Sequence, residues 1–282
     1  MLSEFDYIAP ATMDEAIAAL ATPGARSLAG GQGLLTAMKL GRLTPPRLVD
    51  LRRVADLRGV DRFEDGGLRI GAMTTLTELL DVPGLPKQHP ALAQAAGAIA
   101  DTQIRNRGTV GGTLVDHFAA SDLAAVLLIC DARLTVAGPA GRRTVPATGF
   151  YSPDGPVLDD AEILVSVDVP VVEPTVRVAY ERVTERATLA PLVAVAVATL
   201  PGGPPGSGWV RIAVTGGTRW PMRIPEAEAA LAGGVAVGDA ADLPVGPDSR
   251  FVDGDAVSAA YRAHLTRVLI GRALSRTGPG DA

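Results

Sequence analysis

The sequence has almost no residues that could hold an inorganic redox centre. Its 282 residues include a single cysteine, Cys130, and three histidines, His89, His117 and His264. One thiol cannot form an intrachain disulfide, and an iron–sulfur cluster normally needs four thiolates. The histidines lack the close spacing of structural zinc ligands, and Cys130 ends an apolar run, as a buried structural thiol would. We therefore expect no metal site, and any redox chemistry must use an organic cofactor or a partner's metal centre.

Long hydrophobic stretches and basic runs are also missing. The longest apolar stretches, such as Leu192–Leu200, fall well short of the roughly 20 residues that a membrane helix needs. The net charge is −5, and no dense Lys/Arg run marks a nucleic-acid or lipid surface. Glu4 and Asp6 stand where a secretory signal carries basic residues. These absences predict a cytoplasmic protein with no nucleic-acid partner and no membrane span.

Two common nucleotide-binding fingerprints are absent, but two other glycine-containing segments are present. No Gly-x-Gly-x-x-Gly follows a strand, and there is no Gly-x-x-x-x-Gly-Lys-Ser/Thr. The segments that do occur, both expected to be loops, are Ala29–Gly33 and Thr109–Thr113. Glycine lets successive backbone N–H groups face one concavity, and such clusters bind anions without a charged side chain. Two of them could hold a diphosphate from both sides, whereas a simple turn is the alternative for either one alone.

Polar side chains accompany both glycine segments. Gln32, Thr36, Thr109 and Thr113 could bond to a phosphate or a ribityl chain. Asp122 follows shortly after, and its carboxylate could accept hydrogen bonds from sugar hydroxyls. For Asp122 the alternative is stabilisation of a helix N-terminus, where a negative charge is favoured.

The pattern of apolar residues and turns predicts an α+β fold in three parts. Residues 1–55 are expected to form a first α/β unit, residues 56–175 a second, and residues 176–282 a C-terminal domain. In the first two units we expect capping boxes at Thr12–Glu15 and Thr75–Glu78. The remaining expectations are a helix over 90–100, a polar and basic linker over 101–107, a hairpin over 133–145, a strand over 163–169, and three valine-rich antiparallel strands covered by a long helix over 256–274.

Longer runs of the sequence are more specific than the glycine pairs. They are Leu28–Leu35, Met38–Leu40, Asp101–Gly112 and Tyr261-Arg262. Together they closely resemble the FAD-binding medium subunit of the molybdenum hydroxylases, a family that includes carbon monoxide dehydrogenase and xanthine dehydrogenase. The resemblance extends over essentially the whole chain. It implies two N-terminal α/β subdomains of the PCMH-type FAD-binding fold and a C-terminal three-stranded antiparallel sheet with helices.

The resemblance also implies a set of cofactor-binding residues but no catalytic residue. FAD would lie between the two N-terminal subdomains, with its diphosphate held by backbone N–H groups of both glycine segments. The matching positions are Ala29, Gly30, Gly31, Gln32, Gly33, Thr36, Ile99, Thr109, Gly111, Gly112, Thr113, Asp122 and Leu164. Leu164 would pack against the flavin ring, with an ordinary core residue as the alternative. For Lys39 a solvated helix lysine is the alternative to a phosphate contact.

The function implied by the resemblance is electron transfer through flavin. In this family electrons pass from a molybdenum centre through two iron–sulfur clusters to FAD, and then to an external acceptor such as NAD, a quinone or oxygen. Because this chain lacks the thiolates for the clusters, the implied partners are an iron–sulfur small subunit and a molybdopterin large subunit. Two alternatives are a stand-alone FAD-dependent oxidoreductase acting directly on a small metabolite, and a scaffold without flavin.

Two segments depart from the family pattern. His117 and Phe118 follow Asp116 where many relatives differ, and Leu189 stands where an aspartate is expected after Arg186. The second segment lies near the exposed face of the flavin in the family. The stand-alone alternative would place His117 or Arg186 at the acceptor pocket.

Overall fold

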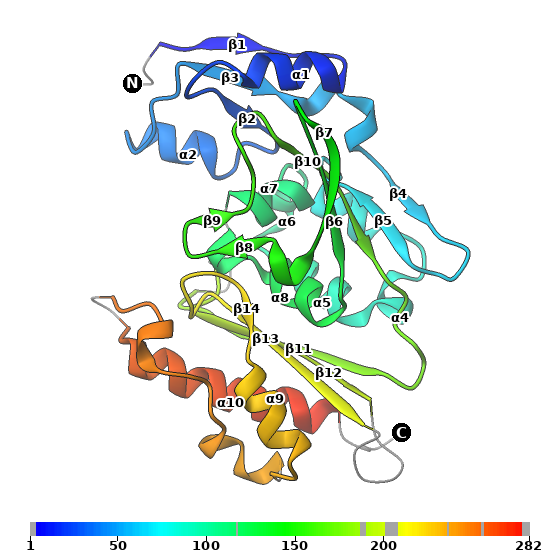
Figure 1. Ribbon diagram of the computed structural model, residues 1–282, viewed down its shortest axis with the longest axis vertical. Coiled ribbons are helices and arrows are strands. Elements are labelled where there is room, and N and C mark those ends of the chain that lie inside the picture. Colours follow the sequence, from blue (N-terminus) through cyan, green and yellow to red (C-terminus); the bar gives the residue numbers. More distant parts are fainter. Residues whose placement is uncertain are drawn as a thin grey trace.

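The chain folds into three tiers that follow one another in sequence order (Figure 1). The computed structural model describes residues 4–116, 118–186, 190–200, 208–235, 237–254 and 257–277. Each tier is built on its own sheet, with the N-terminal tier at one end and the C-terminal tier at the other. Within the described ranges, no helix combines the length and apolar character needed to cross a membrane.

The N-terminal tier is a small parallel sheet with two crossover helices. Its strands lie in the order β1-β3-β2. The elements are β1 (Asp6–Ile8), α1 (Met13–Leu20), β2 (Arg26–Leu28), α2 (Leu34–Lys39) and β3 (Arg47–Asp50). The expected capping box is present at the start of α1, where the Glu15 N–H donates to Thr12 Oγ1 and the Glu15 carboxylate accepts from the Thr12 N–H. The helices supply the crossovers that parallel strands need.

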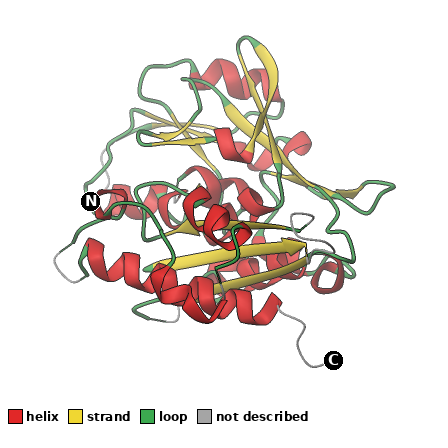
Figure 2. Cartoon of the chain, turned by 60° about the horizontal axis from the view of Figure 1, so that its bottom comes forward, coloured by secondary structure: helices red, strands yellow, loops and turns green. Residues whose placement is uncertain are grey.

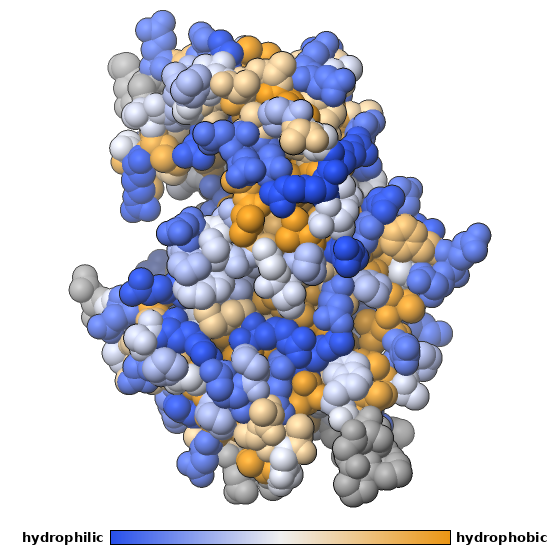
Figure 3. Space-filling model, in the orientation of Figure 1, coloured by the Kyte–Doolittle hydropathy of each residue, from blue (hydrophilic) through white to orange (hydrophobic). Residues whose placement is uncertain are grey.

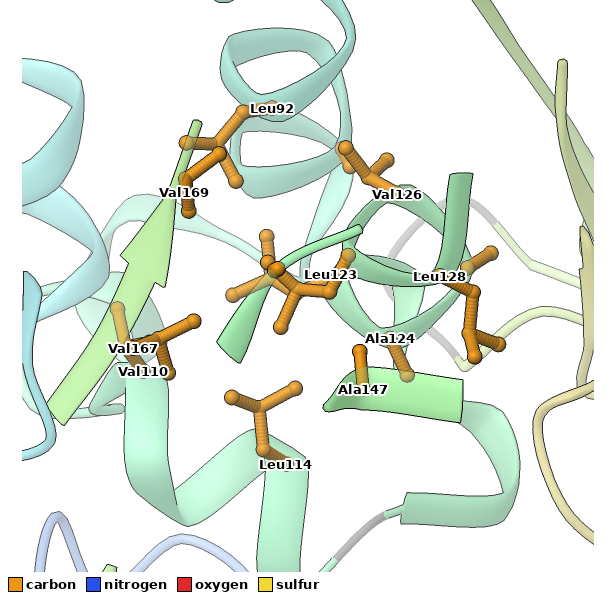
Figure 4. Packing of buried hydrophobic residues seen from close by; sticks show 14 of the residues in the cluster. Leu92, Val110, Leu114, Leu123, Ala124, Val126, Leu128, Ala147, Val167 and Val169 are labelled. Carbon is orange, nitrogen blue, oxygen red and sulfur yellow. The ribbon is translucent and has the colours of Figure 1, made fainter. Parts of the chain in front are cut away.

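The middle tier is an antiparallel sheet covered by short helices. Its strands lie in the order β4-β5-β10-β6-β7. They are β4 (Val60–Arg62), β5 (Leu68–Gly71), β6 (Arg133–Gly138), β7 (Gly141–Pro146) and β10 (Ile163–Val169), and the helices are α3 (Leu76–Leu80), α4 (Leu85–Gln88), α5 (Pro90–Ala98), α6 (Thr102–Arg105), α7 (Val110–Val115) and α8 (Asp122–Ile129). Side chains from α5, α7 and α8 meet Val167 and Val169 of β10 in the core (Figure 4).

Two expectations for the middle tier are wrong. The stretch 101–107 is not a linker, because Asp101 caps α6 by accepting the Ile104 N–H at 2.8 Å. The second glycine segment is not a loop either, since Thr109 caps α7 and both Gly111 and Gly112 lie in its first turn. In both places a side-chain oxygen that accepts an N-terminal N–H offsets the weak helix propensity of the sequence.

The C-terminal tier has one strand more than the sequence predicts. Its antiparallel order is β11-β12-β13-β14. The strands are β11 (Arg177–Val183), β12 (Val193–Leu200), β13 (Trp209–Thr215) and β14 (Met222–Arg223), and the helices are α9 (Pro225–Ala232) and α10 (Ala259–Thr277). β14 has two residues, which is too short to leave a periodic signal. Helices lie along the outer face of this sheet (Figure 2).

Strand β12 joins the C-terminal tier to the middle tier. Its valines, Val193, Val195 and Val197, belong to the core that includes α10, whereas its alanines, Ala194, Ala196 and Ala198, belong to the core of the middle tier. Successive side chains of a strand point to opposite faces. The alternation of Val and Ala therefore buries both faces of one strand, and the core of the middle tier extends onto the inner face of the C-terminal sheet.

Candidate functional site

A cavity of about 860 Å³ lies between the N-terminal and middle tiers, and its rim includes Ala190. This volume is within the range of roughly 300–1,000 Å³ typical of small-molecule and cofactor sites. The space-filling view shows the molecule hollowed between the N-terminal tier and the part of the middle tier near the short β8–β9 hairpin (Tyr151–Ser152 and Gly155–Pro156) (Figure 3). All the residues that the sequence assigns to the cofactor line this cavity: Ala29, Gly30, Gly31, Gln32, Gly33, Thr36, Ile99, Thr109, Gly111, Gly112, Thr113, Asp122 and Leu164. Lys39 is exposed and is not among the lining residues.

The two glycine segments come together at this cavity. A Cβ atom added to Gly30 would lie only 2.2 Å from the carbonyl oxygen of Arg107. A Cβ added to Gly112 would lie 3.9 Å from the Cβ of Ala29. The backbone at Gly30 thus touches the residues just before the second glycine segment, and only a residue without a side chain fits there.

The first glycine segment presents a row of unpaired donors. The N–H groups from Gly30 to Leu34 donate to no acceptor within the described part of the chain. The carbonyl groups are occupied instead, since Gly31 accepts from Leu35 at 3.3 Å and Gln32 accepts from the Thr36 hydroxyl at 2.7 Å. Consecutive unpaired N–H groups in a concave turn form a site for an anion.

The second glycine segment offers fewer main-chain donors than the sequence suggests. The Gly111 N–H donates to the Ala72 carbonyl at 2.8 Å, and the Gly112 N–H donates to Thr109 Oγ1 at 3.1 Å. The start of α7 therefore uses these donors internally. Thr109 and Thr113 also line the cavity from this segment, with the Thr113 hydroxyl 3.3 Å from that of Ser121.

The turn after α5 forms another wall of the cavity and is held by arginines. Ala100 has a φ of 47°, in the left-handed region that side-chain-bearing residues rarely adopt. Arg105 donates to the carbonyls of Ile99 and Ala100 at 2.9 and 2.8 Å, and Arg182 donates to the carbonyl of Ala98 at 2.6 Å. Three successive carbonyl groups are thus held by guanidinium groups, one of which comes from the C-terminal tier.

Asp122 lies in the cavity wall and is paired with the C-terminal tier. Its carboxylate accepts hydrogen bonds from the Tyr180 hydroxyl and from Arg182, the latter at 2.8 Å. Burial raises the pKa of the Asp122 carboxyl, while the bonds from Tyr180 and Arg182 act in the opposite direction. Asp122 is also the first residue of α8, so both the helix-stabilising and the cavity-lining interpretations agree with its position.

Several lining residues were missed by sequence reasoning. Arg26 and Ser27 of β2 contribute to the cavity, as does the stretch from Pro156 to Ile163 before Leu164. Neither set stands in a recognisable motif. The only local hint was the Pro, Gly and Asp content of residues 153–160, which indicates a turn and not a binding wall.

The structure describes one of the two residues invoked for a stand-alone enzyme, Arg186. Arg186 is exposed and is not among the lining residues, and His117 and Leu189 lie outside the described residues. Cys130 is partly buried, and burial raises the pKa of its thiol to about 12, so that it stays protonated. The described ranges contain no group of three or more His, Cys, Asp or Glu side chains placed to hold a metal ion.

Unpaired amides, threonines and apolar strand residues that line one cavity define a protein that binds a nucleotide cofactor with an anionic bridge. The family described as the FAD binding domain in molybdopterin dehydrogenase matches residues 3–172 of this chain. The chain belongs to this family, and FAD is its cofactor.

Similar proteins extend the comparison to the C-terminal tier. The chain is 32% identical to the carbon monoxide dehydrogenase medium chain of Afipia carboxidovorans over 285 aligned residues, which cover 96% of each chain. It is 40% identical to the corresponding medium chain of Hydrogenophaga pseudoflava over 185 residues, a match that spans 64% of that relative's length. The carbon monoxide dehydrogenase structure from Hydrogenophaga pseudoflava that lacks the Mo-pyranopterin moiety superposes with a TM-score of 0.86 at 33% identity, covering 98% of each chain.

Proposed function

We propose that this chain is the flavoprotein subunit of a molybdenum hydroxylase-type dehydrogenase. Its FAD would receive electrons from iron–sulfur clusters on a small subunit, which are fed by a molybdopterin large subunit, and would pass them to an external acceptor. The single cysteine supports clusters on a separate polypeptide. The composition supports a cytoplasmic location.

The observation that carries this proposal is the meeting of the two glycine segments at one cavity. We assign the unpaired N–H groups from Gly30 to Leu34 to the FAD diphosphate. The hydroxyls of Thr109 and Thr113 would add donors from the other side, and Asp122 would face the sugar or ribityl hydroxyls. Leu164 would pack on the flavin ring. FAD itself supplies the exchange between one- and two-electron steps, and the chain's residues bind and orient it.

Two measurements test the proposal. The purified chain should show the visible absorption band of flavin, or gain it on incubation with FAD. A native pull-down followed by metal analysis should recover iron- and molybdenum-containing polypeptides. The proposal fails if the chain binds no flavin, or if no such polypeptides associate and electrons from clusters never reach the flavin.

A further inference from the structure

One wall of the cavity is a stretch without regular structure between β9 and β10. Leu158, Asp159, Asp160 and Ala161 line the cavity from this stretch, next to Pro156 at the end of β9. Ala161 has a φ of 65°, which costs an L-residue about 1–2 kcal/mol. Asp159 and Asp160 are exposed, so burial alone does not hold the wall in place.

An ion pair ties this wall to the sheet. Arg143 of β7 donates from Nε to Glu162 Oε1 at 2.8 Å and from a terminal nitrogen to Glu162 Oε2 at 2.6 Å. Arg143 also donates to the Val157 carbonyl at 2.8 Å, and the Asp159 N–H donates to Glu162 Oε2 at 2.8 Å. The pair therefore holds the wall at two points, Val157 and Asp159, as well as at Glu162 itself.

The side chain of Glu162 is largely buried and lies close to the backbone of Gly138. The Glu162 side chain is 9% exposed, and a Cβ added to Gly138 would lie 2.6 Å from its Cγ. The hydrogen bonds from Arg143 lower the pKa of Glu162, and those to Glu162 raise the pKa of Arg143. Both groups therefore stay charged near neutral pH.

The pair also lies in register with Leu164, the residue assigned to the flavin ring. In the sheet, Arg143 of β7 is paired with Val136 of β6, and Val136 is paired with Leu164 of β10. Glu162 precedes Leu164 by only two positions. A displacement of Glu162 would therefore also move the start of β10, where Leu164 lines the cavity.

We infer that Arg143 and Glu162 are positioning residues that fix the stretch 156–161 as a wall over the bound flavin and thereby limit which electron acceptors reach it. This inference rests on the proposed function of the cavity. In the described residues no hydrogen bond or ion pair joins Arg143 or Glu162 to Gly30–Leu34, so loss of the pair should change access to the flavin more than the binding of FAD.

A second ion pair in the same sheet provides a matched control. Arg69 of β5 donates to both carboxylate oxygens of Asp168 of β10, at 2.8 and 2.7 Å. This pair has the same two-bond geometry, but neither residue lines the cavity. Asp168→Asn therefore weakens an equivalent pair without touching the wall.

The first experiment measures amide hydrogen exchange over residues 150–162 in the full chain without FAD. Glu162→Gln and Arg143→Met should each speed exchange at Val157 to Asp159 by about ten-fold or more, since hydrogen bonds to charged groups are lost. Arg143→Lys, which keeps the charge but loses the fork of donors, should give an intermediate rate. Asp168→Asn should leave this stretch at the wild-type rate.

The second experiment uses the FAD-loaded chain after photoreduction. Reoxidation rates are compared for dioxygen and for a bulky two-electron dye, because only the dye is excluded by a closed wall. The ratio of the dye rate to the dioxygen rate should rise in Glu162→Gln and Arg143→Met. It should take an intermediate value in Arg143→Lys and the wild-type value in Asp168→Asn.

The two experiments separate the possible failures. Unchanged exchange in both Arg143→Met and Glu162→Gln, or an unchanged rate ratio, would overturn the inference. If Glu162→Gln does not fold, Arg143→Lys and Arg143→Met decide, because the Arg143 side chain is 38% exposed. If the chain binds no FAD, the proposed function fails, while the exchange rates still show whether the pair holds the wall.

Discussion

At the scale of single residues, arginines hold main-chain oxygens in place around the cavity. Arg105 holds the Ile99 and Ala100 carbonyls, Arg143 holds that of Val157, and Arg262 of α10 holds the Leu192 and Gly216 carbonyls at 2.6 and 3.1 Å. A guanidinium offers several donors in one plane, so a single side chain can fix two carbonyl groups at once. Ile99, Ala100 and Val157 lie outside regular helices and strands, and these contacts replace the hydrogen bonds that a helix or sheet would otherwise supply to them.

His89 gives a prediction about acid stability. The residue is 2% exposed, and its Nδ1 has no hydrogen-bond partner in the described part of the chain. Burial lowers the pKa of His89 below the unfolded value of about 6.5. The unfolded chain therefore takes up a proton first, and folding stability falls as the pH drops below about 6.5, by at most about 1.4 kcal/mol per pH unit from this group.

Replacing His89 tests this directly. His89→Gln should flatten the decline of the free energy of unfolding between pH 7 and 5, as measured by urea denaturation at each pH. His264→Gln, which changes an exposed ring on α10, should follow the wild-type curve. Parallel curves for His89→Gln and the wild type would show that His89 does not contribute.

Sequence reasoning found the residues that form a local pattern and missed those that do not. The glycines and threonines were recognised because they stand close together in two short segments of the sequence. Arg143, Glu162 and Arg182 stand alone among ordinary strand and loop residues. They come near the cavity only because strand pairing brings together segments that are far apart in the sequence. A short stretch of sequence contains no information about such pairing.

At the scale of elements, the glycine segments place the end of β2 against the start of α7. Capping boxes at Thr12–Glu15 and Thr75–Glu78 were predictable because both side chains lie within four residues. The helix at the second glycine segment was not, because glycine is a weak helix former and the fold decides the outcome. Tertiary hydrogen bonds, such as that from Gly111 to Ala72, supply what the propensity lacks.

Gly30→Ala should weaken cofactor binding. The new Cβ would meet the Arg107 carbonyl at 2.2 Å, so the two glycine segments must move apart. We expect a loss of about 1–3 kcal/mol in stability from the overpacking, and a rise of about ten-fold or more in the dissociation constant of FAD. Fluorescence titration of FAD and urea denaturation measure the two effects.

Gly97→Ala is the matched control in α5. There the nearest heavy atom to a new Cβ is Leu80 Cδ2 at 3.9 Å, so the change should stabilise the helix by about 0.5–1 kcal/mol and leave FAD binding unaltered. Wild-type affinity in Gly30→Ala would contradict the contact between the segments.

At the scale of the whole molecule, the C-terminal tier supports one wall of the cavity. Arg182 and Tyr180 hold Asp122, and Ala119 accepts hydrogen bonds from the Thr215 hydroxyl at 3.1 Å and the Gly216 N–H at 2.8 Å. The family match ends at residue 172, yet the wall formed by Ala120 and Asp122 depends on residues beyond it. The sequence predicted this tier as a separate layer, and the contacts that join it to the cavity were not foreseeable from its strand pattern.

Removal of the Arg182 guanidinium should affect stability and FAD binding together. Arg182→Met leaves the carboxylate of Asp122 buried without its cation, and loss of one partner from a buried pair costs about 3–5 kcal/mol. The double variant Arg182→Met/Asp122→Asn should recover part of this loss, because no buried charge remains. Urea denaturation with and without FAD measures both effects.

An exposed pair serves as the comparison. The side chains of Arg142 and Asp56 are 57% and 65% exposed at 3.5 Å, so Arg142→Met should cost no more than about 1 kcal/mol. If Arg182→Met is no worse than Arg142→Met, the C-terminal tier does not support the cavity in this way.

The two-sided burial of β12 limits how this chain can be recombined with its relatives. A chimera that exchanged the C-terminal part would have to keep valines and alanines in the same phase along the strand. A shift of one residue would press valines against α8 and leave alanines beneath α10, so that the packing on both faces of the strand would be lost at once. Exchange of this tier is therefore constrained by a single strand more than by the helices around it.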